Sequence, residues 1–145
     1  MRILTAFTHS LGGQDAYALA ARLSDALSWP MDMVSIIRGG THGAITEGSD
    51  IAYQDVVLQQ VVQWMDEVTY VRPTELPVTK HLRYNDSFPE GLIETAVELG
   101  SSLLVAGGGR HGLTGRVSLG SIGQTLLNAS PVPVALAPRG TRFDR

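Results

Sequence analysis

The sequence has no cysteine, few charged residues and no long apolar run, and each absence excludes a class of protein. Without cysteine the chain can form neither a disulfide nor a thiolate metal site. No stretch approaches the roughly 18 apolar residues of a membrane-spanning helix, so we expect no membrane association. The net charge of −3, with charged residues at 17% of the chain, gives no overall attraction to nucleic acid.

The composition that remains is that of an ordinary globular domain. The 145 residues, 43% of them hydrophobic, predict one domain spanning 1–145 with a conventional core. The opening MRILTAF is too short and too polar in its flanks for a signal peptide, so we expect a cytoplasmic protein. The four histidines show no metal-ligand spacing, and we expect no metal site.

Short apolar segments alternate with segments of helical periodicity, which is typical of βαβ units and a parallel sheet. We expect five strands, at 3–7, 31–37, 78–84, 103–106 and 132–137. Four helices are predicted between them, with apolar stripes at 16–27, 57–68, 92–99 and 122–129. Asp86 or Ser87 can cap the third helix and Gly100 can end it. The glycine-rich segment 38–50 has no periodicity and is predicted to be a loop.

Right-handed crossovers make this an open parallel five-stranded α/β sheet of order 3-2-1-4-5, with helices on both faces. Strands 1 and 4 are then neighbours whose connections leave in opposite directions. Ligands bind at such a switch point, outside the carboxyl ends of the strands. The expected crevice lies among Thr8, the end of the second strand and the loop that begins at Gly107.

The segment 103–121, LLVAGGGRHGLTGRVSLGS, is the most informative part of the chain. Glycines 107–109 allow backbone amides to approach a ligand closely, because no Cβ stands in the way. Gly120 and Ser121 lie where the next helix begins, so free N–H groups and the positive end of the helix dipole point into the same space. Phosphate is the anion that such places usually bind, although serine is also a good N-cap without any ligand.

Two well-known phosphate motifs fit this loop incompletely. Gly107-x-Gly109-x-x-Gly112 matches the dinucleotide fingerprint, but the helix begins near Gly120 and no acidic residue follows about 20 positions later. Gly107 and Gly112 also have the spacing of a P-loop, but Leu113 stands where its phosphate-gripping lysine belongs.

A third pattern fits better. Gly107, two residues, Arg110, nine residues and Gly120-Ser121 resemble the phosphate loop of the universal stress proteins. The segment GSIGQTLLNASPVPVALAP is similar to that family's last helix and strand, and RILTAFTHSLGGQDAYALAARLSDAL to its first strand and helix. The likeness covers nearly the whole chain, and it implies a Rossmann-like fold of the adenine nucleotide alpha hydrolase type.

The resemblance also implies a site and a ligand. It implies an adenine nucleotide, ATP with or without Mg²⁺, bound by Ala6, Thr8, Ile37, Arg38, Ala106, Gly107, Gly109, Arg110, His111, Gly120, Ser121 and Ile122. Two of these residues depart from the ATP-binding pattern. Arg110 replaces the second glycine of the loop, and Thr8 replaces an aspartate at the end of the first strand. Losing a carboxylate hydrogen bond of about 1.5–3 kcal/mol weakens binding roughly tenfold to a hundredfold.

The last strand, 132–137, carries prolines at 131 and 133, which favour an edge position. A bare apolar edge is a liability, and family members pair this strand across a two-fold axis. We therefore expect a homodimer through residues 132–137.

Hydrolysis of a nucleotide needs an oriented water, usually a metal-holding carboxylate, and a group that stabilises the developing charge, and the expected crevice offers no acidic group. Asp15, Glu47 and Asp50 are the nearest acids in sequence. The sequence therefore favours a stress-response sensor or regulator that binds a nucleotide without efficient turnover. Two alternatives stay open: a protein–protein adaptor with an empty pocket, blocked by Arg110, and a slow hydrolase that uses Ser121.

Overall fold

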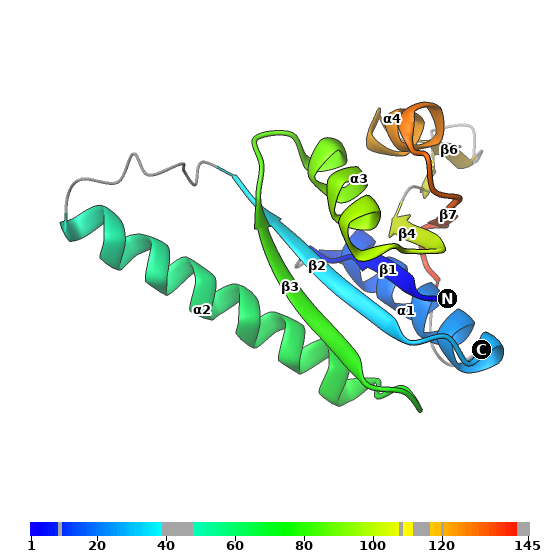
Figure 1. Cartoon of the computed structure of the whole chain (residues 1–145), viewed down its shortest axis with the longest axis horizontal. Coiled ribbons are helices and arrows are strands. Elements are labelled where there is room, and N and C mark those ends of the chain that lie inside the picture. The colour runs from blue at the N-terminus through cyan, green and yellow to red at the C-terminus, as the bar shows by residue number, and fades with distance from the viewer. Residues whose placement is uncertain (9, 39–47, 108, 112–116, 120, 142–145) are drawn as a thin grey trace.

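The computed structural model describes residues 1–8, 10–38, 48–107, 109–111, 117–119 and 121–141. They form four helices and seven strands (Figure 1). In chain order the elements are β1 (Ile3–Ala6), α1 (Leu11–Leu27), β2 (Met31–Ile37), α2 (Gly48–Val71), β3 (Val78–Tyr84), α3 (Phe88–Leu99), β4 (Leu103–Gly107), β5 (Gly109–His111), β6 (Val117–Leu119), α4 (Ser121–Ala129) and β7 (Val134–Ala137).

Five of these strands build one parallel sheet in the order β3-β2-β1-β4-β7. This is the predicted 3-2-1-4-5 order. The predicted fifth strand is β7, because β5 and β6 form a separate two-stranded sheet. As predicted, β3 and β7 are the two edges. The strands of the centre are the most deeply buried, and all four residues of β1 are buried.

Helices cover both faces of the sheet, as predicted, and alternate side chains of the strands divide between two cores. Ile3 and Met33 pack with Tyr17 of α1 and Met65 of α2 on one face. On the other face the core contains Leu4, Val34 and Leu104 of the strands, Leu92 and Ala96 of α3, and Leu126 of α4. This division follows from the two-residue period of a strand.

Capping residues fix the helix ends, and at α3 they are the two that the sequence indicated. The Ser10 side chain caps α1 by accepting the Gly13 N–H, and the Ser87 side chain caps α3 by accepting the Glu90 N–H. Gly100 ends α3 in the left-handed conformation, with φ of 65°, which is costly for residues that carry a Cβ. Met65 of α2 is inaccessible to solvent, and Trp64 packs against the same core cluster.

The structure corrects the sequence analysis at two segments. Helix α2 begins at Gly48, whereas the prediction placed a loop as far as residue 50. The segment between β4 and α4 was predicted as a loop throughout, yet it contains β5 and β6, which pair antiparallel with Gly109 opposite Leu119. The start of α2 and the segment that holds β5 and β6 are both rich in glycine or polar residues. They therefore lack the periodicity on which the predictions depend.

Polar contacts tie the elements together away from the cores. The Tyr17 hydroxyl donates a 2.6 Å hydrogen bond to the Arg72 carbonyl, which joins α1 to the end of α2, and burial raises the pKa of Tyr17 to about 12. At the amino end of the sheet, buried Asp32 of β2 is bound by Arg2 and by His81 of β3. Among the described residues, no helix is long and apolar enough to cross a membrane.

Candidate functional site

The carboxyl ends of β1 and β4 lie side by side at the point where the strand order reverses. Thr5 is aligned with Val105 in the parallel register between these strands. The chain leaves β1 toward β2 on one side, and it leaves β4 toward β7 on the other. A ligand site is expected at such a switch point. Ala6 ends β1 and Ala106 is the residue before the last one of β4, but their side chains are buried in the core, so only their backbone can face a ligand.

Gly13 of α1 and Gly107 of β4 bring the start of this helix unusually close to both strand ends. A Cβ on Gly107 would lie 2.4 Å from the Gly12 carbonyl oxygen. A Cβ on Gly13 would lie 1.9 Å from the Thr8 carbonyl oxygen. Since real Cβ atoms do not approach backbone atoms so closely, both positions require glycine. The first turn of α1 is therefore packed directly against Thr8 and against the first glycine of the predicted phosphate loop.

Thr8 follows β1 and has an exposed side chain. The Phe7 N–H still bonds to the Val34 carbonyl at 2.9 Å, which holds this end of β1 against β2. The Thr8 Oγ1 and Ser10 Oγ atoms are 2.7 Å apart, and the Thr8 carbonyl accepts the Ser10 N–H at 2.8 Å. Two hydroxyl groups therefore stand together at the switch point.

The end of β2 forms a further border of the same sheet edge. Ile37 is the last residue of β2 and is half-buried, while Arg38 directly after it is exposed. The Ile37 carbonyl accepts the Asn85 N–H at 3.1 Å, so this strand end is fixed against the chain that follows β3. The structure thus places an apolar and a cationic residue two strands from Gly107.

The predicted loop residues lie on several elements. Gly109, Arg110 and His111 make up β5. Ser121 is the first residue of α4, as the sequence predicts, and Ile122 beside it is 38% exposed. Gly120 lies outside the described residues. The short β5–β6 ribbon connects Gly107 to the start of α4, so both ends of the predicted phosphate loop are attached to regular structure.

The acidic residue closest to this site along α1 is Asp15, whose side chain is buried. The Asp15 Oδ2 atom accepts the Gly140 N–H at 3.1 Å, which attaches the segment after β7 to α1. Asp15 thus has a structural contact. Within the described parts of the chain, no three histidine or acidic side chains gather as metal ligands would.

The sequence analysis missed three residues of this arrangement: Ser10, Gly12 and Gly13. The sequence did contain a signal, because two consecutive glycines at the start of a helical pattern usually have a packing or functional reason. Their contacts with Thr8 and Gly107 depend on how α1 packs on the sheet, so spacing along the chain could not predict them.

Comparison with known proteins gives a family-level match. Residues 1–138 match the model of the universal stress protein family. Universal stress proteins of Mycobacterium tuberculosis and Mycobacterium bovis are 40% identical over 67 residues. That match covers 46% of this chain and 23% of those proteins, so it spans less than a quarter of the length of these curated relatives.

Solved structures share the fold over almost the full length. The universal stress protein UspA from Lactobacillus plantarum has a TM-score of 0.70 at 15% identity, covering 94% of this chain and 97% of that one. A universal stress protein in complex with cAMP has a TM-score of 0.67 at 16% identity, covering 97% and 98%. One from Archaeoglobus fulgidus in complex with dAMP has a TM-score of 0.60 at 19% identity, covering 94% and 96%.

Proposed function

The chain belongs to the universal stress protein family, and on that basis we propose that it binds an adenine nucleotide, with ATP as the first candidate, at the switch point between β1 and β4. Binding there regulates a stress response in the cytoplasm by changing the surface that another protein contacts. The nucleotide is a signal in this proposal and is not efficiently hydrolysed.

The close packing of Gly107 on Gly12 is the observation that carries the proposal. It brings the first glycine of the loop, the first turn of α1 and Thr8 to one place at the carboxyl edge of the sheet. Two solved relatives with the same fold are complexes with cAMP and with dAMP, so adenine nucleotides fit this architecture in those proteins. The remaining contacts are assigned to Ile37 and Arg38 at the end of β2, and to residues 109–111 and 120–122.

Calorimetric titration of ATP with Mg²⁺ into the purified protein tests the proposal, after the preparation has been checked for bound nucleotide. We expect a dissociation constant in the micromolar range, about −8 kcal/mol. Absence of heat from a preparation free of nucleotide would contradict nucleotide binding. Thr8 in place of the carboxylate would then favour the alternative of a protein–protein adaptor.

A substitution in the loop tests the location of the site. Gly120→Val adds a branched side chain directly before α4, and we expect it to reduce ATP affinity at least about tenfold (about 1.4 kcal/mol). Ala129→Val makes a similar change at the exposed far end of the same helix and serves as the control. Equal affinity of the two folded variants would contradict the assignment of this loop to the site.

A further inference from the structure

The paired hydroxyl groups of Thr8 and Ser10 have a definite hydrogen-bonding capacity. Their oxygens are 2.7 Å apart, both side chains are exposed, and Ser10 Oγ also accepts the Gly13 N–H at 3.2 Å. Each hydroxyl carries one hydrogen. The bond between the two oxygens uses one of these hydrogens, in whichever direction it runs. One O–H group therefore remains to donate to an outside acceptor.

The surroundings of the pair add further hydrogen-bond donors. Leu11 and Gly12 open α1, and by their position their N–H groups have no acceptor within the helix. The positive end of the α1 dipole lies at the same place. Gly107 packs on Gly12, which is two residues after Ser10 in the chain. The Thr8–Ser10 pair therefore adjoins the predicted phosphate loop. Asp15, the first acid of α1, is buried and is bound to the Gly140 N–H.

We propose that the Thr8–Ser10 hydroxyl pair binds a phosphate oxygen of the nucleotide, and that Ser10 is a specificity residue of the site. This inference rests on the proposed function. A neutral O–H donor suits an anionic oxygen, whereas a carboxylate at position 8 accepts hydrogen bonds only and repels phosphate. A carboxylate at position 8 would bind hydrogen-bond donors of the ligand, whereas threonine at this position can bind an anionic oxygen.

Binding of AMP and adenosine to charge variants tests this inference, because the two ligands differ by one phosphate group. We expect Thr8→Asp to weaken AMP binding at least about tenfold, since two like charges then meet in a partly desolvated site. The asparagine of Thr8→Asn has the shape of the aspartate without its charge, so this variant is expected to weaken AMP binding less. Gln60→Glu places a new charge of the same sign at an exposed position in the middle of α2, as a control for net charge.

A second variant separates the capping role of Ser10 from its role in binding. Aspartate caps a helix as well as serine does, so Ser10→Asp is expected to unfold at the same denaturant concentration as the wild type. Its AMP affinity is nevertheless expected to fall at least about tenfold, and the loss should shrink at high salt because salt screens charges. A purely structural Ser10 predicts wild-type affinity for AMP in this variant.

The outcomes distinguish this inference from the proposed function. Loss of AMP binding by both aspartate variants, with adenosine binding retained, supports contact with phosphate. If Thr8→Asp leaves AMP binding intact, or weakens adenosine and AMP by the same factor, the pair contacts the sugar or the base and the inference is wrong. If the wild-type protein binds neither AMP nor ATP, the proposed function itself is wrong and the inference fails with it.

Discussion

Asp32 is a buried carboxylate that joins three parts of the sheet at its amino edge. It is 2% exposed, and it accepts hydrogen bonds from Arg2 Nε at 2.7 Å, from Arg2 Nη2 at 3.0 Å and from His81 Nε2 at 2.9 Å. Burial alone would raise the pKa of Asp32, but the hydrogen bonds from Arg2 and His81 outweigh it and lower the pKa. The ionised carboxylate is therefore the form that the fold stabilises.

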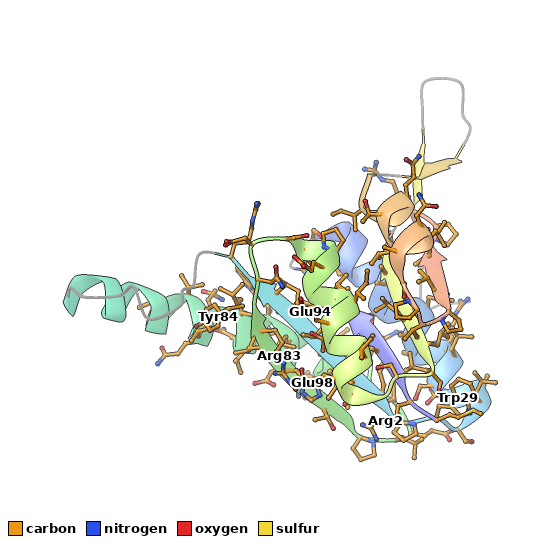
Figure 2. The ribbon with its side chains drawn as sticks, turned by 45° about the horizontal axis from the view of Figure 1, so that its top comes forward. Arg2, Trp29, Arg83, Tyr84, Glu94 and Glu98 are labelled. Atoms are coloured by element: carbon orange, nitrogen blue, oxygen red, sulfur yellow. The ribbon has the colours of Figure 1, made fainter. Side chains whose placement is uncertain are left out.

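We expect Asp32→Asn to lower the free energy of unfolding at pH 7 by about 2–4 kcal/mol. The asparagine amide nitrogen can only donate, and it would face donors on Arg2 and His81. Glu98→Gln is the matched control, because Glu98 also receives two hydrogen bonds from one arginine, Arg83, but in an exposed pair between α3 and β3 (Figure 2). Exposed pairs contribute little, so urea unfolding should show almost no change for the control.

The same variant makes a prediction about pH. A carboxylate whose folded pKa is lowered contributes stability above its unfolded pKa, about 3.9, and this contribution is lost as pH falls through the folded value. The stability difference between wild type and Asp32→Asn should therefore be full at pH 7 and should shrink below about pH 4. An equal difference at pH 7 and pH 3, measured by urea unfolding, would show that Asp32 acts by shape and not by charge.

At the scale of an element, α1 contains two adjacent glycines, and they differ in how much space a Cβ would have. A Cβ on Gly13 would meet the Thr8 carbonyl oxygen at 1.9 Å and the Thr8 nitrogen at 2.7 Å, so alanine there must move the helix off the strand end. A Cβ on Gly12 would have the Ser10 Oγ atom as its nearest neighbour, at 3.9 Å, which is an ordinary contact. The helix therefore contacts Thr8 closely at Gly13, and it has space for a methyl group at Gly12.

We expect Gly13→Ala to destabilise the fold by at least about 2 kcal/mol through overpacking. Gly12→Ala should leave the stability unchanged or raise it by up to about 1 kcal/mol, because alanine is the better helix former. The two variants have the same composition, so comparing their urea unfolding midpoints removes any effect of the added methyl group itself. Coinciding midpoints would mean that α1 does not pack on Thr8 as closely as the structure shows.

At the scale of the whole molecule, the sequence predicted the topology because strands and helices here have clear and different periods. Residues 103–106 of β4 form a continuous apolar run and β3 carries several polar residues, so a central place for β4 and an edge place for β3 could be predicted from the sequence pattern. The β5–β6 ribbon and the start of α2 escaped prediction, because glycine-rich segments have no such pattern. The contacts of Gly12, Gly13 and Ser10 escaped it as well, since they arise only when α1 docks on the sheet.

The free edge of β7 determines how the whole molecule is expected to assemble. The Pro133 carbonyl accepts the Leu104 N–H at 2.9 Å, so the backbone carbonyl of Pro133 faces β4. By the alternation of a strand, the polar backbone groups of Val134 and Leu136 face the open side, where the described part of the chain places no further strand. An unpaired apolar edge invites pairing with another chain, and we propose that a second copy pairs with residues 132–137.

Sedimentation equilibrium of the wild type is expected to give the mass of a dimer, and Pro133→Lys is expected to give a monomer. Pro133 is exposed, so lysine costs the monomer little, but a two-fold axis would place two like charges on neighbouring strands. Pro77→Lys, at an exposed proline just before the opposite edge strand β3, should stay dimeric. A monomeric wild type, or a dimeric Pro133→Lys variant, would exclude this edge as the interface. The exposed Val97 and Leu127 of α3 and α4 would then be the next surface to test.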